Sequence, residues 1–227
     1  MTTLFPEGWT EPKQILVILA HPDDPEFFCG ASIARWTHAG HQVTYCLLTN
    51  GNKGAKNRTI TPDELTAVRQ KEQCAAAAVL GVRDVRFLNH EDGYLVPDLQ
   101  IRREIVRVIR EVKPSIVVTS DPTNYFPGDV RLNHPDHRAA GEAALSAVYP
   151  GAGNHLYFPD LLEAGLDTVD VREVWVTLTH QPTVTIDVTE YWGLKLEALH
   201  RHESQIRDQR ALDERILGRF TPDSSVN

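Results

Sequence analysis

The sequence has few cysteines, fewer basic than acidic residues and no long apolar run, and each shortage excludes a class of protein. Its three cysteines are scattered and show no Cys-x-x-Cys spacing, which argues against a disulfide framework and a thiolate zinc site. Its 23 lysines and arginines face 31 acidic residues, a net charge of -8. Because a phosphate backbone requires clustered cations, nucleic acid is not expected as a partner.

No stretch approaches the roughly 18 to 20 uninterrupted apolar residues of a membrane span. The first residues, MTTLFPEGWTEPK, lack the basic and then apolar order of a signal peptide. We therefore predict a soluble, cytoplasmic protein. A length of 227 residues, 41% of them hydrophobic, suffices for one sizeable core, so we predict a single domain over residues 1–227. The oligomeric state stays open, with a homo-oligomer among the alternatives.

From residue 14 onward, short β-branched apolar runs alternate with longer helical patterns. The predicted strands are 14–20, 42–49, 85–88, 115–120, 173–179 and 183–188, and the predicted helices lie near 29–39, 62–80, 99–112, 136–148 and 190–217. Such alternation is typical of a parallel sheet wrapped by helices. We predict an α/β fold of Rossmann-like type, with a mostly parallel sheet and helices on both faces.

Polar residues follow the first four predicted strands, where open α/β sheets bind their ligands. These residues are His21-Pro22-Asp23-Asp24, Asn50-Gly51-Asn52, His90-Glu91-Asp92-Gly93 and Asp121-Pro122-Thr123-Asn124. Turn and cap formation alone explains most of these loops. It does not explain a histidine beside two consecutive aspartates, so this edge of the sheet is the expected functional edge.

The first turn lacks the G-x-G-x-x-G of a dinucleotide site and the G-x-x-x-x-G-K-[ST] of a P-loop, which argues against a nucleotide-binding Rossmann protein. It offers His21, Asp23 and Asp24 instead, and His134-Pro135-Asp136-His137 follows later. Imidazole and carboxylate are the ligands of three-residue catalytic zinc sites, whose fourth position holds water. Each cluster also has a plain alternative, because H-x-x-H occurs by chance and paired aspartates cap helices.

Several further short motifs accompany the two clusters. In chain order they are Ala20-His21-Pro22-Asp23-Asp24, Cys29-Gly30, Thr49-Asn50-Gly51, Arg69-x-x-Glu72 with Leu80-Gly81, Asp92-Gly93 and His134-Pro135-Asp136-His137, with a looser match over 186–205. Together they resemble the LmbE-like, PIG-L-type zinc N-deacetylases, over about residues 14–210. The Rossmann-like fold that this resemblance implies agrees with the fold predicted from periodicity.

The resemblance implies that zinc, the expected cofactor, is bound by His21, Asp24 and His137. It implies that Asp23 is the general base and that His134 stabilises the tetrahedral oxyanion, preferably as an imidazolium. A bound zinc ion lowers the pKa of water to about 7, so a modest base suffices. Whether Asp23 or His134 protonates the leaving amine stays open.

The remaining assignments concern residues around this centre. The resemblance also implies that Arg69 and Asp92 contact the polar part of the substrate. The alternative for Arg69 is a surface residue paired with Glu72. Asp136 is expected to orient one of the histidine rings by a hydrogen bond. His202 either reaches the site or is a solvated surface residue.

The expected activity is removal of an acetyl group from an N-acetylglucosamine-like sugar or sugar conjugate. The alternatives are an amidase that acts on a bulkier sugar-thiol conjugate and a non-catalytic sugar-binding relative. Leu132 stands where some members carry a tyrosine, whose role Tyr94 or Tyr125 would then fill. Segments 125–129 and 150–172 are predicted to form the rim that selects the substrate.

Overall fold

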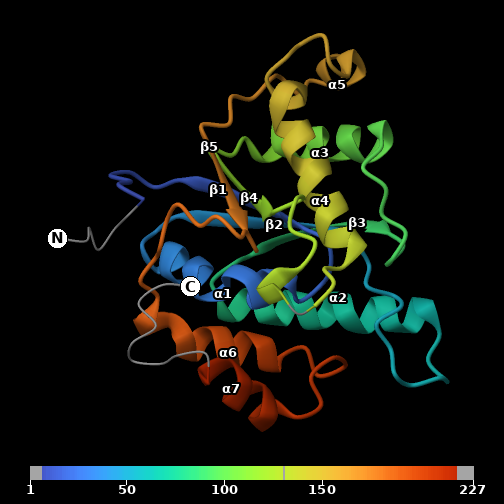
Figure 1. Cartoon of the computed structure of the whole chain (residues 1–227). Helices are drawn as coiled ribbons and strands as arrows, with labels where there is room; N and C mark the ends of the chain where they lie inside the picture. The colour runs from blue at the N-terminus through green and yellow to red at the C-terminus, as the bar shows by residue number, and fades with distance from the viewer. Residues whose placement is uncertain (1–6, 130, 219–227) are drawn as a thin grey trace.

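The structure is a computed structural model that describes residues 7–129 and 131–218 (Figure 1). Its centre is a five-stranded, all-parallel sheet in the order β3-β2-β1-β4-β5. The strands are β1 (Gln14–Leu19), β2 (Gln42–Thr49), β3 (Asp84–His90), β4 (Ile116–Ser120) and β5 (Glu173–Thr177). The chain reverses its direction of winding between β1 and β4, the switch point at which such sheets bind ligands. The predicted α/β class is confirmed.

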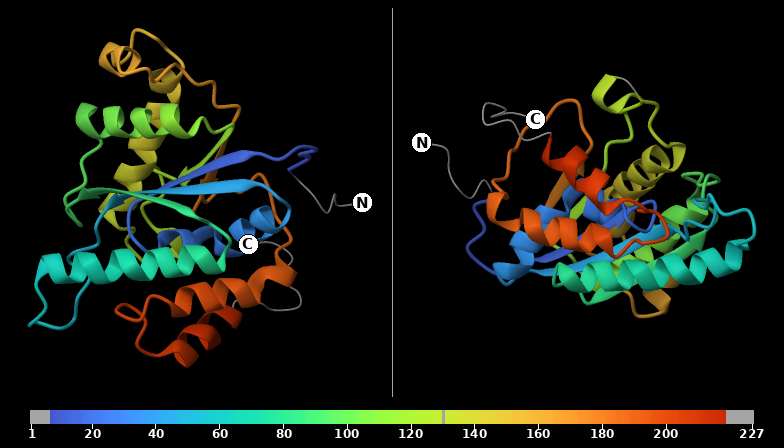
Figure 2. Two further views of the ribbon diagram at one scale, coloured as in Figure 1. Left: turned by 180° about the vertical axis from the view of Figure 1, so that it is seen from behind. Right: turned by 90° about the horizontal axis from the view of Figure 1, so that it is seen from below.

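Helices cover both faces of the sheet (Figures 1 and 2). One face carries α1 (Asp24–His38), α2 (Pro62–Val79), α6 (Trp192–His200) and α7 (Gln209–Leu217), and the other carries α3 (Leu99–Val112), α4 (Pro135–Ser146) and α5 (Pro159–Glu163). Short 3₁₀ turns η1 (Pro127–Asp129) and η3 (Thr189–Tyr191) and the π turn η2 (Ala147–Ala152) complete the elements. None of the described helices is long and apolar enough to cross a membrane.

Strand β1 shows how the sequence dictates this layering. All of its residues after Gln14 are buried apolar side chains, as expected for a central parallel strand covered on both faces. Leu16 and Ile18 pack into the core beneath α3 and α4, whereas Ile15 and Val17 pack into the core beneath α1 and α2. The alternation follows from the two-residue period of a strand. It fixes the carboxyl end of β1 in the middle of the molecule.

Two predicted elements are wrong. The long helix predicted over 190–217 is two helices, because the chain turns at 201–208. In this turn the His202 side chain is buried. Asp208 then caps α7, since its side chain accepts the Ala211 N–H (2.9 Å). Residues 183–188 form no strand and pair with none of the described strands. In addition, α1 begins at Asp24, earlier than the predicted residue 29, so the paired aspartates stand at its first turn.

Segment 150–172 lies where the parallel strands begin, which we call the amino edge of the sheet. The polar loops lie at the opposite, carboxyl ends of the strands. The fully buried Arg110, in the last turn of α3, holds it there by donating to the carbonyls of Gly151 (3.2 Å), Asn154 (3.1 Å) and Tyr157 (3.1 Å). The segment then enters the start of β5 at the same edge (Figure 1). The prediction that 150–172 forms a rim around the site is therefore wrong.

Candidate active site

A cleft of about 980 Å³ opens at the carboxyl ends of the strands. All of the predicted site residues except Asp136 line it, namely His21, Asp23, Asp24, Arg69, Asp92, His134 and His137. They come from the loop after β1, from α2, from the loop after β3 and from the start of α4. No residue of 150–172 lines the cleft, and its far wall comes from α6 and α7 through Trp192, Lys195 and Arg215.

His21, Asp24 and His137 form a compact cluster of potential ligand atoms, all within 4.8 Å of one another. The Asp24 carboxylate lies between the two rings, with Oδ2 3.3 Å from His21 Nδ1 and Oδ1 3.2 Å from His137 Nε2. The His21 backbone N–H also donates to Asp24 Oδ2 (2.8 Å), which ties the loop to the first residue of α1. Two imidazole nitrogens and one carboxylate are a ligand set of catalytic zinc sites.

The other nitrogen of each ring already has a partner. His21 Nε2 lies 3.2 Å from Asp136 Oδ2 and 3.2 Å from Asp92 Oδ1, and His137 Nδ1 lies 2.9 Å from Asn133 Oδ1. A ligand histidine characteristically donates its second N–H to an oxygen of this kind, which fixes the tautomer. The lone pairs of His21 Nδ1 and His137 Nε2 then face Asp24, so the residues fit a metal ion at that point.

Asp136 holds a loop as well as a ring. A second cluster of potential ligands, His21, Asp92, His134 and Asp136, is equally compact. However, the Asp136 carboxylate already accepts the backbone N–H groups of Gly93 (2.6 Å) and Leu95 (3.2 Å). It therefore suits the orientation of a ring better than the binding of an ion. The ring that it contacts most closely is that of His21.

Electrostatic attraction between the Asp24 carboxylate and the two imidazoles favours the charged forms of His21 and Asp24. Burial alone would raise the pKa of Asp24, but His137 and His21 hold it well below its usual range. Burial likewise disfavours a charged His21, yet Asp24, with Asp136 and Asp92, raises the pKa of that imidazole well above its usual value. A proton and a metal ion compete for this cluster, because one ring nitrogen cannot bind both at once.

Asp23 differs from Asp24 in conformation and in proton affinity. Its backbone is left-handed, at φ 99° and ψ -25°, which costs a residue other than glycine about 1–3 kcal/mol. Its Oδ2 lies 3.0 Å from Arg69 Nη2. Burial raises the pKa of Asp23 to about 6, with Arg69 lowering it and Asp24 raising it further. A carboxylate with this pKa is an effective proton acceptor near neutral pH.

Arg69 is buried, and its guanidinium lies against the loop after β1. It donates from Nη1 to the Gly51 carbonyl (2.9 Å) and from Nη2 to the Pro22 carbonyl and to Asp23. A Cβ at Gly51, whose φ is 63°, would overlap the guanidinium, so this contact requires glycine. The alternative of surface pairing with Glu72 is wrong, because Glu72 accepts hydrogen bonds from Ser204.

His134 is the N-cap of α4 and its side chain is 40% exposed. Its Nδ1 accepts the Asp136 backbone N–H (3.2 Å), and its Nε2 lies 3.9 Å from Asp92 Oδ1. Burial, with the positive charge of His21, lowers the pKa of His134. An Nδ1 that accepts a hydrogen bond carries no proton, so this contact favours the neutral Nε2–H tautomer over the imidazolium expected from the sequence.

Sequence reasoning missed three buried residues beside the site, Glu26, Gln73 and Asn133, and it left His202 open between the site and the surface. His202 lies outside the cleft lining and bonds to Glu26 (3.1 Å), so it is neither at the reacting centre nor on the surface. Asn133 had a signal, since it stands four residues before His137. Tyr94 and Tyr125, the proposed substitutes for the missing tyrosine, are exposed and line no part of the cleft.

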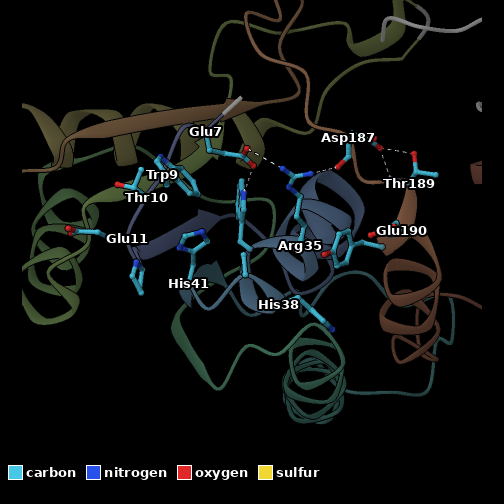
Figure 3. Close-up of a pocket in the computed structure, with 14 residues that line it drawn as sticks. Glu7, Trp9, Thr10, Glu11, Arg35, His38, His41, Asp187, Thr189 and Glu190 are labelled. Carbon is cyan, nitrogen blue, oxygen red and sulfur yellow. Dashed lines mark hydrogen bonds and ion pairs between the residues drawn. The ribbon is translucent and has the colours of Figure 1, made fainter. Parts of the chain in front are cut away.

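A second pocket, of about 680 Å³, lies at the amino edge of the sheet (Figure 3). Several of its polar side chains bond to one another or to the backbone. Glu7 accepts the Trp36 indole N–H (3.1 Å) and lies 3.5 Å from Arg35 Nη2, and Arg35 also donates to the Asp187 carbonyl (2.8 Å). His41 accepts the Lys13 backbone N–H (3.1 Å). These contacts tie the segment before β1 to α1 and to the chain before η3.

Comparison with known proteins adds both a family and a fold. The sequence matches the family described as PIG-L, GlcNAc-PI de-N-acetylase, over residues 16–148. The diacetylchitobiose deacetylase of Thermococcus kodakarensis is 35% identical over 199 residues, which cover 88% of this chain and 72% of that protein. The structure of N,N'-diacetylchitobiose deacetylase from Pyrococcus horikoshii matches with a TM-score of 0.84 at 27% identity, over 95% of this chain and 81% of that chain.

The fold by itself does not identify the reaction. GalB, a 4-carboxy-2-hydroxymuconate hydratase from Pseudomonas putida, matches with a TM-score of 0.66 at 22% identity, over 96% of this chain and 92% of that chain. The same sheet and helices thus occur in proteins named for different chemistry. What this chain does must be argued from the side chains in its cleft.

Proposed function

The chain belongs to the PIG-L family of de-N-acetylases, and from that premise we propose that it is a zinc-dependent hydrolase that removes the acetyl group from an N-acetylglucosamine-like sugar or sugar conjugate. It is an enzyme of the amide-hydrolysing class. One observation carries the proposal. The His21–Asp24–His137 cluster offers three ligand atoms at one point, and Asp23, whose pKa is about 6, stands directly beside it.

His21, Asp24 and His137 would hold the metal. Two imidazoles with one carboxylate suit zinc better than magnesium or calcium, which prefer oxygen ligands. When bound, zinc supplies Lewis acidity that polarises an amide carbonyl and lowers the pKa of water to about 7. Asp136 and Asn133 support the metal ligands, because each holds the outer nitrogen of one ring.

Asp23 accepts the proton of the attacking water in this scheme. Arg69 binds its Oδ2, which leaves Oδ1 to accept the proton. Because the pKa of Asp23 is about 6, the carboxylate is mostly ionised at pH 7 yet returns a proton readily. When the tetrahedral intermediate collapses, Asp23 passes this proton to the nitrogen of the leaving amine.

His134 has a different part. Its neutral ring carries a proton on Nε2, which can donate a hydrogen bond to the oxyanion that develops on the amide oxygen. It cannot protonate the leaving amine without becoming an imidazolate. The choice that the sequence left open is therefore assigned to Asp23, acting first as base and then as acid.

Two residues were predicted to bind the sugar. Asp92 lines the cleft beside His134, and its carboxylate is suited to accept a sugar hydroxyl. Arg69 also lines the cleft, but its donors bind Asp23 and two carbonyls. We assign it first to holding Asp23, with any sugar contact coming from the part of the guanidinium that faces the cleft.

The decisive test combines metal content with turnover. Purified protein should hold about one zinc per chain. Asp23→Asn should retain that zinc and lower acetate release by about 10²–10⁴-fold, the usual contribution of a general base. Asp63→Asn, at an exposed aspartate in the first turn of α2, is the matched control and should leave turnover unchanged. Full activity in Asp23→Asn would refute the proposed chemistry.

A panel of N-acetylated sugars and sugar conjugates, assayed for free amine, separates the alternatives. Turnover confined to bulky sugar-thiol conjugates would indicate the amidase, and bound zinc without turnover of any amide would indicate a sugar-binding relative.

We also propose a cytoplasmic location on the sequence features given above. Cell fractionation tests it.

A further inference from the structure

The peptide bond between Pro22 and Asp23 is held at both of its polar atoms by helix α2. Arg69 Nη2 donates to the Pro22 carbonyl, and Gln73 Oε1 accepts the Asp23 backbone N–H at 2.7 Å. Arg69 and Gln73 are four residues apart, so they lie on the same face of the helix. This peptide plane cannot rotate without losing both bonds, and the left-handed conformation of Asp23 is thereby fixed.

The conformation of Asp23 decides where its carboxylate points. Asp24 begins α1 and faces the two imidazoles, whereas the side chain of Asp23 faces Arg69 and the cleft. Rotation of the peptide before Asp23 would swing its carboxylate and leave Asp24 in place. The bond from the Asp23 N–H to Gln73 therefore controls the proton acceptor separately from the metal ligands.

The amide of Gln73 has a donor end and an acceptor end, and its surroundings select between them. Its Nε2 donates to both oxygens of Glu26, at 3.0 and 3.1 Å. Because a carboxylate only accepts, the donor end must face Glu26 and the acceptor end must face Asp23. His202 Nε2 lies 3.1 Å from Glu26 Oε2, and Glu26, Gln73 and His202 are all fully buried. The His202 ring thus gives the buried Glu26 carboxylate a further hydrogen-bond partner.

We propose that Gln73 is a positioning residue for Asp23, and that the buried Glu26–His202 pair fixes which end of the Gln73 amide faces the Asp23 backbone. This inference rests on the proposed role of Asp23 as proton acceptor. Among the described residues, no hydrogen bond joins Gln73 to His21, Asp24 or His137. Loss of Gln73 should therefore affect proton transfer and leave metal binding intact.

The first test is Gln73→Met, which keeps the length of the side chain and removes its hydrogen bonds. We expect kcat to fall by about 10–100-fold, because small misplacements of a catalytic group cost that much. KM should stay within about twofold, zinc content should be unchanged, and a crystal structure should show Asp23 outside the left-handed region. Gln70→Met is the matched control, since Gln70 is on the same helix and its amide bonds to Asn89. Unchanged kcat or lost zinc in Gln73→Met would overturn the proposal.

A second measurement distinguishes positioning from general structural support. In the Asp23→Asn background the carboxylate is already gone, so adding Gln73→Met should cost no further rate. A structural role would instead give the same factor in both backgrounds, and that additivity would overturn the proposal. Full activity of Asp23→Asn alone would refute the proposed function itself. A slow Asp23→Asn together with a fully active Gln73→Met would refute only the positioning.

A polarity swap keeps the test available if Gln73→Met does not fold. Gln73→Glu with Glu26→Gln preserves the order of donors and acceptors, because the carboxylate at position 73 accepts both from the Asp23 N–H and from the amide at position 26. Each single substitution should lower kcat by about tenfold, and the double variant should recover to within about threefold of the original rate. A double variant no faster than the single variants would overturn the assignment of Glu26.

Discussion

Both edges of the sheet carry a hollow lined by arginine, carboxylate, histidine and aromatic side chains. At the amino edge these groups bond to one another, with Glu7 between Arg35 and the Trp36 indole. At the carboxyl edge the outer nitrogens of His21 and His137 are bonded, and their inner nitrogens face a single carboxylate. The amino-edge contacts join parts of the chain, whereas the carboxyl-edge lone pairs converge on a point where a cation fits.

The contrast shows that composition does not identify a site. The pocket at the amino edge also holds titratable residues, but its arginine, Arg35, is already paired with Glu7. Asp23 and Asp24 are the opposite case, since burial and neighbouring charges drive the pKa values of two adjacent carboxyls in opposite directions. Divergence of this kind is characteristic of reacting centres.

Removing one histidine from the cleft and one from the amino-edge pocket should give the largest difference in zinc content and turnover. His137→Ala deletes a metal ligand, so we expect loss of bound zinc and of all measurable turnover. His41→Ala deletes a ring that contacts Trp9 and the Lys13 backbone, and turnover should persist. Metal analysis and an acetate-release assay on both variants make the comparison. Zinc retained in His137→Ala would contradict the assigned ligand set.

Substitution of Asn133, which contacts the proposed metal ligand His137, should have a smaller effect on zinc binding. Asn133→Ala removes the oxygen that holds His137 Nδ1, so zinc affinity should fall by about 10–100-fold. Asn154→Ala, in the segment at the amino edge, should leave the affinity unchanged. Competition with a chelator of known affinity measures both. Equal affinities in the two variants would show that Asn133 does not support the ligand.

The pH dependence of the cleft should follow Asp23. Its carboxyl is protonated below a pKa of about 6 and then cannot accept a proton, so kcat should fall as the pH decreases through this region. A bound dication lowers the pKa of a nearby carboxyl. The acidic limb of the plot of kcat against pH should therefore lie no higher than about pH 6. Arg69→Lys weakens the contact that lowers the pKa of Asp23, so the limb should move to higher pH. Arg35→Lys should leave the profile in place.

The amino-edge pocket should affect stability alone. Glu7→Ala deprives the Trp36 indole of its acceptor and removes the carboxylate beside Arg35. We expect a loss of about 1–2 kcal/mol in the free energy of unfolding, the usual cost of an unsatisfied buried donor. The kcat of the folded enzyme should not change. Denaturant titration and steady-state kinetics check the two statements separately.

The strands and most helices were predictable because they depend on local pattern. The β-branched run of β1 and the apolar stripe of α3 lead to the observed boundaries within a residue. The break between α6 and α7 was not, since residues 201–208 hold no glycine or proline. It follows from distant partners, with His202 bonded to Glu26 and Ser204 to Glu72. No short-range pattern encodes such contacts.

The site was predictable where its residues are neighbours in sequence. The residues His21, Asp23 and Asp24 stand together in the sequence, and the resemblance to the PIG-L family pointed to their roles and to that of His137. Gln73 was missed although it follows Arg69 by four residues, because a helical spacing alone does not say what the helix face touches. The composition of 150–172 is typical of a loop and does not indicate the edge at which it lies. Arg110 decides that position through its hydrogen bonds to four carbonyls of the segment.

The distance along the chain between Glu26 and His202 also bears on synthesis. The two residues are 176 positions apart, so at typical elongation rates the carboxylate leaves the ribosome on the order of 10–35 s before its imidazole partner exists. Until then Glu26 lacks the imidazole partner that it has in the folded protein. We therefore expect the hydrogen bonds that fix the Asp23 loop to be complete only after α6 and the residues that follow it have been synthesised.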